Sequence, residues 1–153
     1  FFGRMIAADP FADVARLAAL GCERLPLDDV MRQSDFVVVV ALLNKDTHHL
    51  IDAGKLALMK PTAYFLNMGR GPITNEAALI DALHMRRIAG AGLDVTEREP
   101  IADDNPLLKM DNVIVTPHAL CWTDECFRDI ATSALQSILD CSQGRRPKHV
   151  VTD

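Results

Sequence analysis

The stretch Gly-Ala-Gly-Leu-Asp-Val-Thr-Glu-Arg-Glu-Pro, residues 90–100, decides the fold class of this chain. It begins with a short apolar run typical of a buried strand, and three carboxylates follow before Pro100: Asp94, Glu97 and Glu99. In an open parallel sheet, ligands bind outside the carboxyl ends of the strands. A strand that ends in a cluster of acids therefore predicts one wall of an active site.

Apolar runs and helix-type repeats alternate along the rest of the chain, which is typical of an α/β protein. Strands are predicted within residues 1–8, 22–25, 35–43, 63–68 and 112–116, and at the start of 90–100. Helices are predicted from Pro10 to about Gly21 and over 28–33, 50–59, 75–87 and 123–141. Pro10 fits the first turn of its helix, and the β-branched run 35–43 predicts a strand covered on both faces. The whole pattern predicts a doubly wound parallel sheet.

Composition narrows the class of protein and its partners. A chain of 153 residues can build one domain with a real core. Its net charge of −5, without a basic block, argues against nucleic acid or an anionic membrane as a partner. The longest apolar run, residues 36–43, is too short to cross a bilayer, which needs about 20 residues.

Cysteine usage and the N-terminus predict the compartment. No signal-peptide pattern begins the chain. The four cysteines lack metal or redox spacing, which predicts free thiols, no metal site and a cytoplasmic location. A weaker alternative has Cys121, close after His118, lining a pocket.

Polar groups follow four of the predicted strands and should converge on one edge of a parallel sheet. They are Asp9, Arg70, the Asp94–Glu99 cluster and His118. Each alone has a structural explanation, such as a helix cap for Asp9 or a pinned turn for Arg70, but their convergence favours an active site. An acid can hold an adenosine ribose, a histidine can exchange a proton near neutral pH, and an arginine can grip a carboxylate with two hydrogen bonds. This set suits a dehydrogenase.

The chain resembles the NAD-dependent D-isomer-specific 2-hydroxyacid dehydrogenases in a series of short stretches that keep the family's order and spacing. The stretches are Ala8-Asp9-Pro10, Ser34-Asp35-Phe36-Val37, Met59-Lys60-Pro61, Asn67-Met68-Gly69-Arg70-Gly71, Ala77-Ala78-Leu79, Gly90-Ala91-Gly92-Leu93-Asp94-Val95, Glu99-Pro100, Asn112-Val113 and Thr116-Pro117-His118. The resemblance implies a Rossmann-type NAD-binding fold.

The same resemblance implies a role for each matching residue. Arg70 would bind the carboxylate and carbonyl of the substrate, and His118 would exchange the hydroxyl proton. Glu99 would pair with His118 and stabilise its charged form. The cofactor would contact Asp9, Leu42, Met68, Gly69, Arg70, Asp94 and His118, with Asp9 on the adenosine ribose, favouring NAD over NADP, and Asp94 on the nicotinamide carboxamide. Glu97 has no role in the family, and we expect it to be solvated.

Two departures from the family pattern qualify this prediction. The glycine-rich GxGxxG turn, the first strand and the N-terminal substrate lobe are expected upstream of Phe1. Residues 1–121 would then be a partial NAD-binding domain, and 122–153 a helix and tail that pack towards that lobe. Val40 and Leu42 stand where the family commonly has a histidine and a proline, so one wall of the cofactor site should be more aliphatic.

The predicted function is hydride transfer between NAD and a small D-2-hydroxy or 2-keto acid, in a homodimer. The chain by itself is expected to be inactive and, because the apolar stripe within Phe127–Cys141 would lack its cover, to self-associate. One alternative is a dinucleotide-sensing scaffold that resembles the C-terminal binding protein corepressors. Another is a purely structural role. Selectivity among 2-keto acids is not encoded in this part of the sequence.

Overall fold

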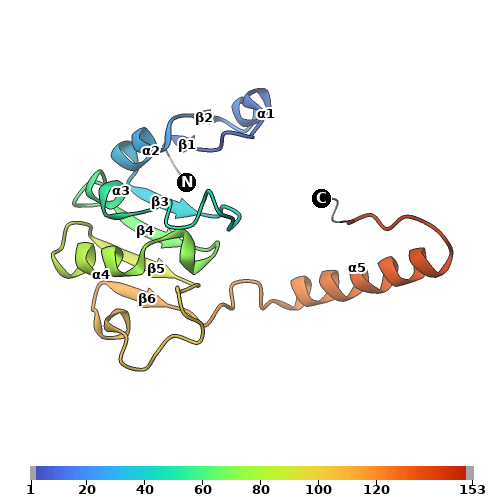
Figure 1. Ribbon diagram of the computed structural model, residues 1–153. Helices are drawn as coiled ribbons and strands as arrows, with labels where there is room; N and C mark the ends of the chain where they lie inside the picture. The colour runs from blue at the N-terminus through green and yellow to red at the C-terminus, as the bar shows by residue number, and fades with distance from the viewer. Residues whose placement is uncertain (1–2, 151–153) are drawn as a thin grey trace. The chain divides into compact units, whose positions relative to one another are not determined.

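The computed structural model describes residues 3–150 and divides them into two compact units, one ending at His118 and the other beginning at Ala119 (Figure 1). Phe1 and Phe2 of the first predicted strand, and the last three residues of the predicted tail, lie outside the described residues. The first unit contains β1 (Met5–Ala7), α1 (Val14–Ala19), β2 (Cys22–Arg24), α2 (Leu27–Gln33), β3 (Phe36–Val39), α3 (Ala53–Ala57), β4 (Tyr64–Asn67), η1 (Gly71–Ile73), α4 (Glu76–His84), β5 (Gly90–Leu93), η2 (Pro106–Lys109) and β6 (Val113–Val115). The second unit contains α5 (Asp124–Ser142).

The strands form two parallel sheets. Strands β3, β4, β5 and β6 lie side by side in chain order, and β1 pairs with β2 (Figure 1). The ends of the larger sheet are in register, because Val39 pairs with Asn67, Asn67 with Leu93, and Leu93 with Val115. The carboxyl ends of these four strands therefore meet at one edge. The predicted Rossmann-type α/β fold is confirmed.

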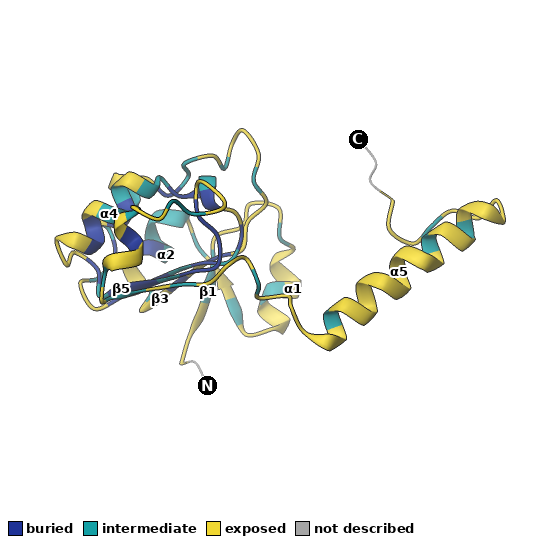
Figure 2. Cartoon of the chain, turned by 90° about the horizontal axis from the view of Figure 1, so that it is seen from below, coloured by how far each residue is buried: buried dark blue, intermediate teal, exposed yellow. Residues whose placement is uncertain are grey.

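One face of the larger sheet carries the core. Val37, Phe65, Ala91 and Leu93 point to it and are buried with residues of the covering helices, such as Leu56 and Leu83. Figure 2 shows α2 and α4 on the same side of the sheet. Right-handed crossovers between strands that are neighbours in sequence place their helices on a single face. The core therefore lies between that face and the helices.

The prediction that the strand in residues 35–43 is covered on both faces is wrong for the described chain. Phe36 and Val38 of β3 are 57% and 53% exposed, and Tyr64 and Ile114 on the same face are exposed too. The rings of Phe36 and Tyr64 stack with centroids 5.7 Å apart. β3 also ends at Val39, sooner than predicted, because the chain turns away into its exit loop.

The first helix also differs from the prediction, since α1 begins at Val14 rather than at Pro10. Asp9 Oδ1 accepts the backbone N–H groups of Phe11 and Ala12, which closes a turn before any helix forms. Asp13 then caps α1 by accepting the N–H groups of the residues two and three positions later. Phe11 is 95% exposed, and α1 buries no residue.

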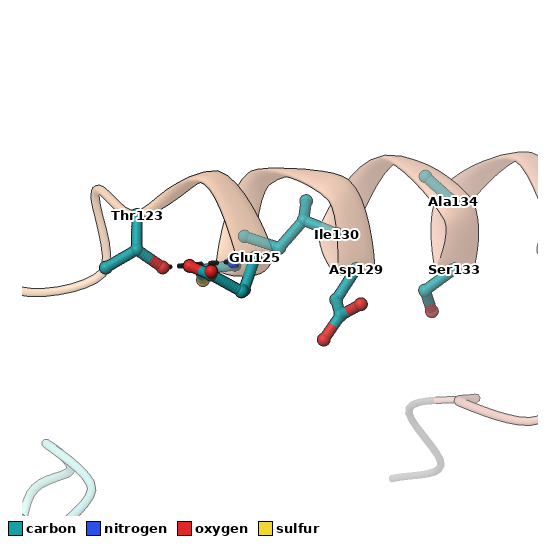
Figure 3. A pocket seen from close by; sticks show the side chains of 7 residues that line it. Thr123, Glu125, Asp129, Ile130, Ser133 and Ala134 are labelled. Atoms are coloured by element: carbon teal, nitrogen blue, oxygen red, sulfur yellow. Dashed lines mark hydrogen bonds between the residues drawn. The ribbon is translucent and has the colours of Figure 1, made fainter.

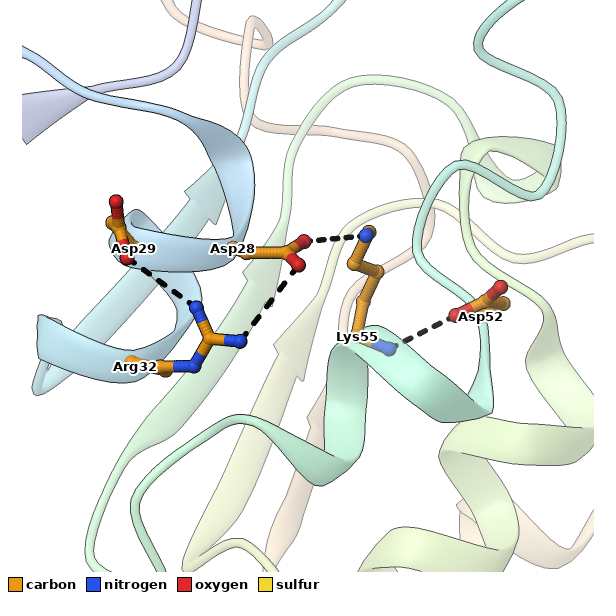
Figure 4. Close-up of polar contacts among 5 residues, drawn as sticks. All are labelled: Asp28, Asp29, Arg32, Asp52 and Lys55. Carbon is orange, nitrogen blue, oxygen red and sulfur yellow. Dashed lines mark hydrogen bonds and ion pairs between the residues drawn. The ribbon is translucent and has the colours of Figure 1, made fainter.

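An ion-pair network joins α2 to α3 (Figure 4). Lys55 of α3 bonds Asp28 of α2 through its Nζ atom, and Arg32 reaches Asp28 at 3.8 Å and Asp29 at 3.3 Å. The side chain of Asp52 caps α3 by accepting the N–H of Lys55 at 2.9 Å. The hydrogen bond from Lys55 lowers the pKa of the Asp28 carboxyl, and the positive charges of Lys55 and Arg32 add to this effect.

The second unit is built on α5, whose predicted range of 123–141 matches the observed helix closely. Thr123 caps it by accepting the N–H of Cys126 at 3.2 Å. The helix buries no residue, and Figure 2 shows it almost wholly exposed. Its exposed apolar side chains are Phe127, Ile130, Leu135, Ile138 and Leu139. Within residues 3–150, no helix combines the length and hydropathy needed to span a membrane.

Candidate active site

A buried asparagine shapes the loop that leaves β4. Asn67 is 1% exposed, and its Nδ2 donates to the carbonyl of Arg70 at 3.1 Å and to Thr74 Oγ1 at 3.3 Å. Its Oδ1 accepts the N–H of Gly69 at 3.1 Å. The family resemblance implies no role for Asn67, but an amide at the end of an apolar strand, two residues before Gly-Arg-Gly, is a usable signal for a loop brace.

The same loop presents three of the predicted site residues. Arg70 is exposed, and its Nη1 donates to the carbonyl of Gly69 at 2.7 Å. Met68 is half-buried, and Gly69 is buried so tightly that a Cβ atom there would lie 3.1 Å from the carbonyl oxygen of Ala41. Gly69 thus brings the exit loops of β3 and β4 together. Leu42, on the β3 exit loop, is 79% exposed.

Asp94 lies directly after β5 and is 4% exposed. Thr116 Oγ1, from the loop after β6, donates to Asp94 Oδ1 at 2.5 Å. A buried carboxylate needs such a donor to offset its desolvation. Thr116 therefore holds Asp94 at the sheet edge, a role that the sequence analysis did not assign.

Glu99 and His118 come together at the exits of β5 and β6. His118 Nδ1 lies 2.8 Å from Glu99 Oε2, and both side chains are partly exposed, at 43% and 40%. The other carboxylate oxygen of Glu99 accepts the N–H of Thr96 at 3.2 Å. His118 has a φ of 54°, in the left-handed region that few non-glycine residues adopt. Its own N–H donates to the carbonyl of Thr116 at 3.0 Å, which helps to hold this conformation.

Asp9 stands apart from this group. Asp9 is exposed after β1, and no strand pairing within residues 3–150 joins β1 to β3, so the sheet ladder does not tie Asp9 to the edge of the larger sheet. Glu97 leaves β5 at the same edge and is exposed, but its carboxylate is bonded to His49 Nε2, so the expectation of a side chain that is only solvated is not met. The register therefore brings the Arg70 loop, Asp94, Glu99 and His118 to a common edge.

A shallow hollow lies along α5 (Figure 3). All its lining residues belong to the second unit: Thr123, Glu125, Cys126, Asp129, Ile130, Ser133 and Ala134. None of them is a predicted site residue, and Cys121, which the weaker alternative placed in a pocket, does not line the hollow. Within residues 3–150, no group of three or more histidine, cysteine, aspartate or glutamate side chains is arranged to hold a metal ion.

Comparison with known proteins identifies the class to which this fold and edge belong. Residues 1–119 match the sequence profile of the D-isomer specific 2-hydroxyacid dehydrogenase, NAD binding domain. The chain belongs to this family of NAD-binding domains.

Individual relatives support the same assignment. Glyoxylate/hydroxypyruvate reductase B from Shigella boydii is 45% identical over 125 residues, covering 82% of this chain and 39% of that protein. The holo form of D-mandelate dehydrogenase from Rhodotorula graminis is similar to the chain with a TM-score of 0.90 and 34% identity, covering 98% of this chain and 44% of that one. The NAD complex of a D-isomer specific 2-hydroxyacid dehydrogenase from Lactobacillus delbrueckii has a TM-score of 0.86 and 29% identity, over 97% and 48% of the two chains. The chain thus spans less than half the length of these proteins.

Proposed function

We propose that this chain is the NAD-binding part of an oxidoreductase that reduces small 2-keto acids, such as glyoxylate or hydroxypyruvate, to D-2-hydroxy acids. Residues 1–121 would hold the cofactor, and 122–153 would pack towards a substrate lobe. The 45% identity to a glyoxylate/hydroxypyruvate reductase supports this class of reaction, and that relative's name supplies the two example substrates. The contact between Glu99 and His118 at the sheet edge carries the proposal.

The pair suits acid–base chemistry at a carbonyl. Glu99 engages Nδ1 of His118, so the substrate would meet the other ring nitrogen, Nε2. During reduction, the proton on Nε2 passes to the oxygen of C2, and during oxidation Nε2 takes it back. The carboxylate of Glu99 would stabilise the positive ring that is present before reduction and after oxidation. Reduction leaves a neutral imidazole, which regains its proton from solvent, and oxidation leaves a charged ring, which returns its proton to solvent.

Arg70 suits the recognition of the substrate's carboxylate. Its guanidinium is exposed and uses Nη1 to hold the carbonyl of Gly69, which fixes the direction of the side chain. The planar group carries further N–H donors that match the two oxygens of a carboxylate. Because Asn67 braces the same loop through the carbonyl of Arg70, the position of Arg70 is defined before any substrate binds.

The residues at the edge also fit NAD. Asp9 uses only Oδ1 towards the described residues, so Oδ2 remains for the ribose hydroxyls. The half-buried side chain of Met68 offers an apolar surface on which a flat ring could lie, next to Gly69. Asp94, fixed by Thr116, would meet the carboxamide. NADH, when bound, supplies the hydride that C2 receives.

Two further expectations belong to the intact protein. We infer a cytoplasmic location, because the four cysteines are free thiols, which persist in reducing compartments. We also infer a homodimer, in which a second copy would cover the part of the apolar stripe of α5 that the substrate lobe leaves exposed.

NADH consumption by the full-length protein with a panel of 2-keto acids tests the proposal. At least one acid of the panel, which includes glyoxylate and hydroxypyruvate, should be reduced, and Arg70→Gln should raise KM for that acid much more than KM for NADH. Binding of NADH without consumption by any acid would contradict the proposal. That result would favour the dinucleotide-sensing scaffold.

A further inference from the structure

A second histidine–carboxylate pair lies at the same edge of the sheet, outside the pair that the proposed function uses. His49 Nε2 bonds Glu97 Oε1, and the two side chains are 35% and 34% exposed. His49 belongs to the exit loop of β3, and Glu97 to the exit loop of β5. Because β4 lies between these strands, the pair joins two loops across a third.

The backbone around His49 is held firmly. Its φ is 51°, a conformation that a non-glycine residue keeps only when its surroundings impose it. The N–H of His49 donates to the carbonyl of Pro72 at 2.8 Å, and the ring of His48 stacks on its ring with centroids 4.1 Å apart. Two further backbone bonds, Ile51 N–H to Ile73 and Asn75 N–H to Ile51, attach the β3 exit loop to the β4 exit loop. His49 is therefore a fixed anchor.

Glu97 is held from a second side through its backbone. Its N–H donates to Glu76 Oε2 of α4 at 2.8 Å, and Glu76 Oε1 accepts from Asn105 Nδ2 at 2.8 Å. The side chain and the backbone of Glu97 thus have partners on different elements. Because both its side chain and its backbone N–H are bonded, Glu97 also restricts the positions of the residues next to it in the chain.

The neighbour of Glu97 is the residue that orients Glu99. The N–H of Thr96 donates to Glu99 Oε1, and Thr96 Oγ1 donates to the carbonyl of Arg98 at 2.8 Å. The carbonyl of Thr96 lies so close to Gly71 that a Cβ on Gly71 would be 1.8 Å from it. The segment Thr96–Glu97 therefore does two things. Glu97 attaches it to His49, and the N–H of Thr96 holds the carboxylate of Glu99, which contacts His118.

We propose that His49 and Glu97 are positioning residues, which fix the Thr96–Glu97 segment where the N–H of Thr96 orients the Glu99 carboxylate towards His118. Neither touches the substrate. The positioning itself is a property of the fold. Only its consequence for turnover rests on the proposed function.

Amide hydrogen exchange, measured by NMR on the 153-residue chain, tests the positioning without any enzyme assay. His49→Leu removes the donor to Glu97, so the amides of Thr96 and Glu97 should exchange about 10-fold faster. The amide of Phe65, in the centre of the sheet, should keep its rate. His49→Gln retains an N–H donor and should restore most of the protection. It is the matched control, because glutamine meets the same backbone strain as leucine.

Substitution of Glu97 tests the same contact from its other side, in case His49→Leu impairs folding. Glu97→Leu should speed exchange at Thr96 as His49→Leu does, whereas Glu97→Gln, which keeps an acceptor, should not. Wild-type exchange at Thr96 in both leucine variants would overturn the inference. Equal acceleration at Phe65 would overturn it as well, because the pair would then contribute only to global stability.

Kinetics of the full-length protein test the consequence for turnover. His49→Leu should lower kcat for the 2-keto acid about 10-fold, leave KM for NADH unchanged, and be rescued by His49→Gln. Faster exchange at Thr96 with unchanged kcat would overturn the catalytic consequence. Absence of turnover in the wild-type protein would instead contradict the proposed function, and the exchange measurement would still decide the positioning.

Discussion

At the scale of single residues, the carboxylate of Asp9 is predicted to make the protein prefer NAD over NADP. Asp9→Ala removes the acceptor for the ribose hydroxyls and the negative charge that would repel a 2′-phosphate. Hydrogen bonds to a charged group contribute about 1.5–3 kcal/mol, so NADH affinity should fall about 10- to 100-fold. NADPH affinity should fall less or rise. Titrations of both cofactors by fluorescence check this, and an unchanged ratio of the two affinities would exclude Asp9 from the ribose site.

Asn67 should be important for stability as well as for the shape of the loop. Asn67→Ala leaves the buried N–H of Gly69 without its partner and removes one of the two donors to the carbonyl of Arg70, which keeps the N–H of Ile73. The free energy of unfolding should fall by about 1–3 kcal/mol, as measured by urea denaturation. Gln143→Ala, at an exposed position on the second unit, is the control and should change it by less than about 0.5 kcal/mol. Equal effects of the two changes would show that Asn67 does not brace the loop.

Family resemblance assigned expected roles to the residues that would contact a ligand, but not to the residues that hold them in place. The contact that it implied between Glu99 and His118 is present in the structure, while the catalytic roles of both residues remain proposals. Asn67 and Thr116 received no role, because a side chain's partner depends on the register of neighbouring strands. The contact between Glu97 and His49 could not be predicted for the same reason, since the two residues are 48 positions apart in the chain.

At the scale of elements, hydrophobic periodicity predicted the order of strands and helices well and their packing less well. The first helix was placed too early, because the hydrogen bonds from Phe11 and Ala12 to Asp9 outweigh the preference of Pro10 for a first helical turn. The strand β3 was expected to be buried on both faces because its residues are β-branched or aromatic. The apolar composition of a strand shows that both of its faces can be buried. Whether they are buried depends on which other elements pack against the sheet.

The junction of α2 and α3 should weaken in acid. Lys55, through its hydrogen bond, holds the pKa of the Asp28 carboxyl below its ordinary value. A lowered folded-state pKa adds stability that is present above the unfolded pKa, near pH 4, and is lost as the pH falls through the folded value. Asp28→Asn should therefore lower the urea midpoint at about pH 6 and have little effect at about pH 2.

The control for this prediction is Asp104→Asn, which changes an exposed carboxylate that has no hydrogen bond to the described residues. Its urea midpoint should match the wild-type protein at both values of pH. A loss of stability in Asp28→Asn that is equally large at both values would show that Asp28 acts through packing rather than through its charge.

At the scale of the whole molecule, the second unit predicts self-association of the 153-residue chain. The apolar stripe of α5 is exposed along its length, with Ile130 at 57% and Ile138 at 64%. Sedimentation should show dimers or larger species, and Ile130→Glu with Ile138→Glu should shift the chain towards monomer. Ser133→Glu, which adds charge beside Asp129, is the control and should not. A stable wild-type monomer at high concentration would refute the prediction.

The central claim concerns His118 as the acid–base group, with Glu99 as its partner. Turnover of the 2-keto acid by the His118→Gln variant of the full-length protein, measured together with NADH affinity, tests it most directly. Loss of a positioned proton donor typically lowers turnover by about 100- to 10,000-fold, so kcat should fall by that factor while the Kd for NADH stays within about 2-fold. A variant that binds NADH and turns over at the wild-type rate would contradict the account.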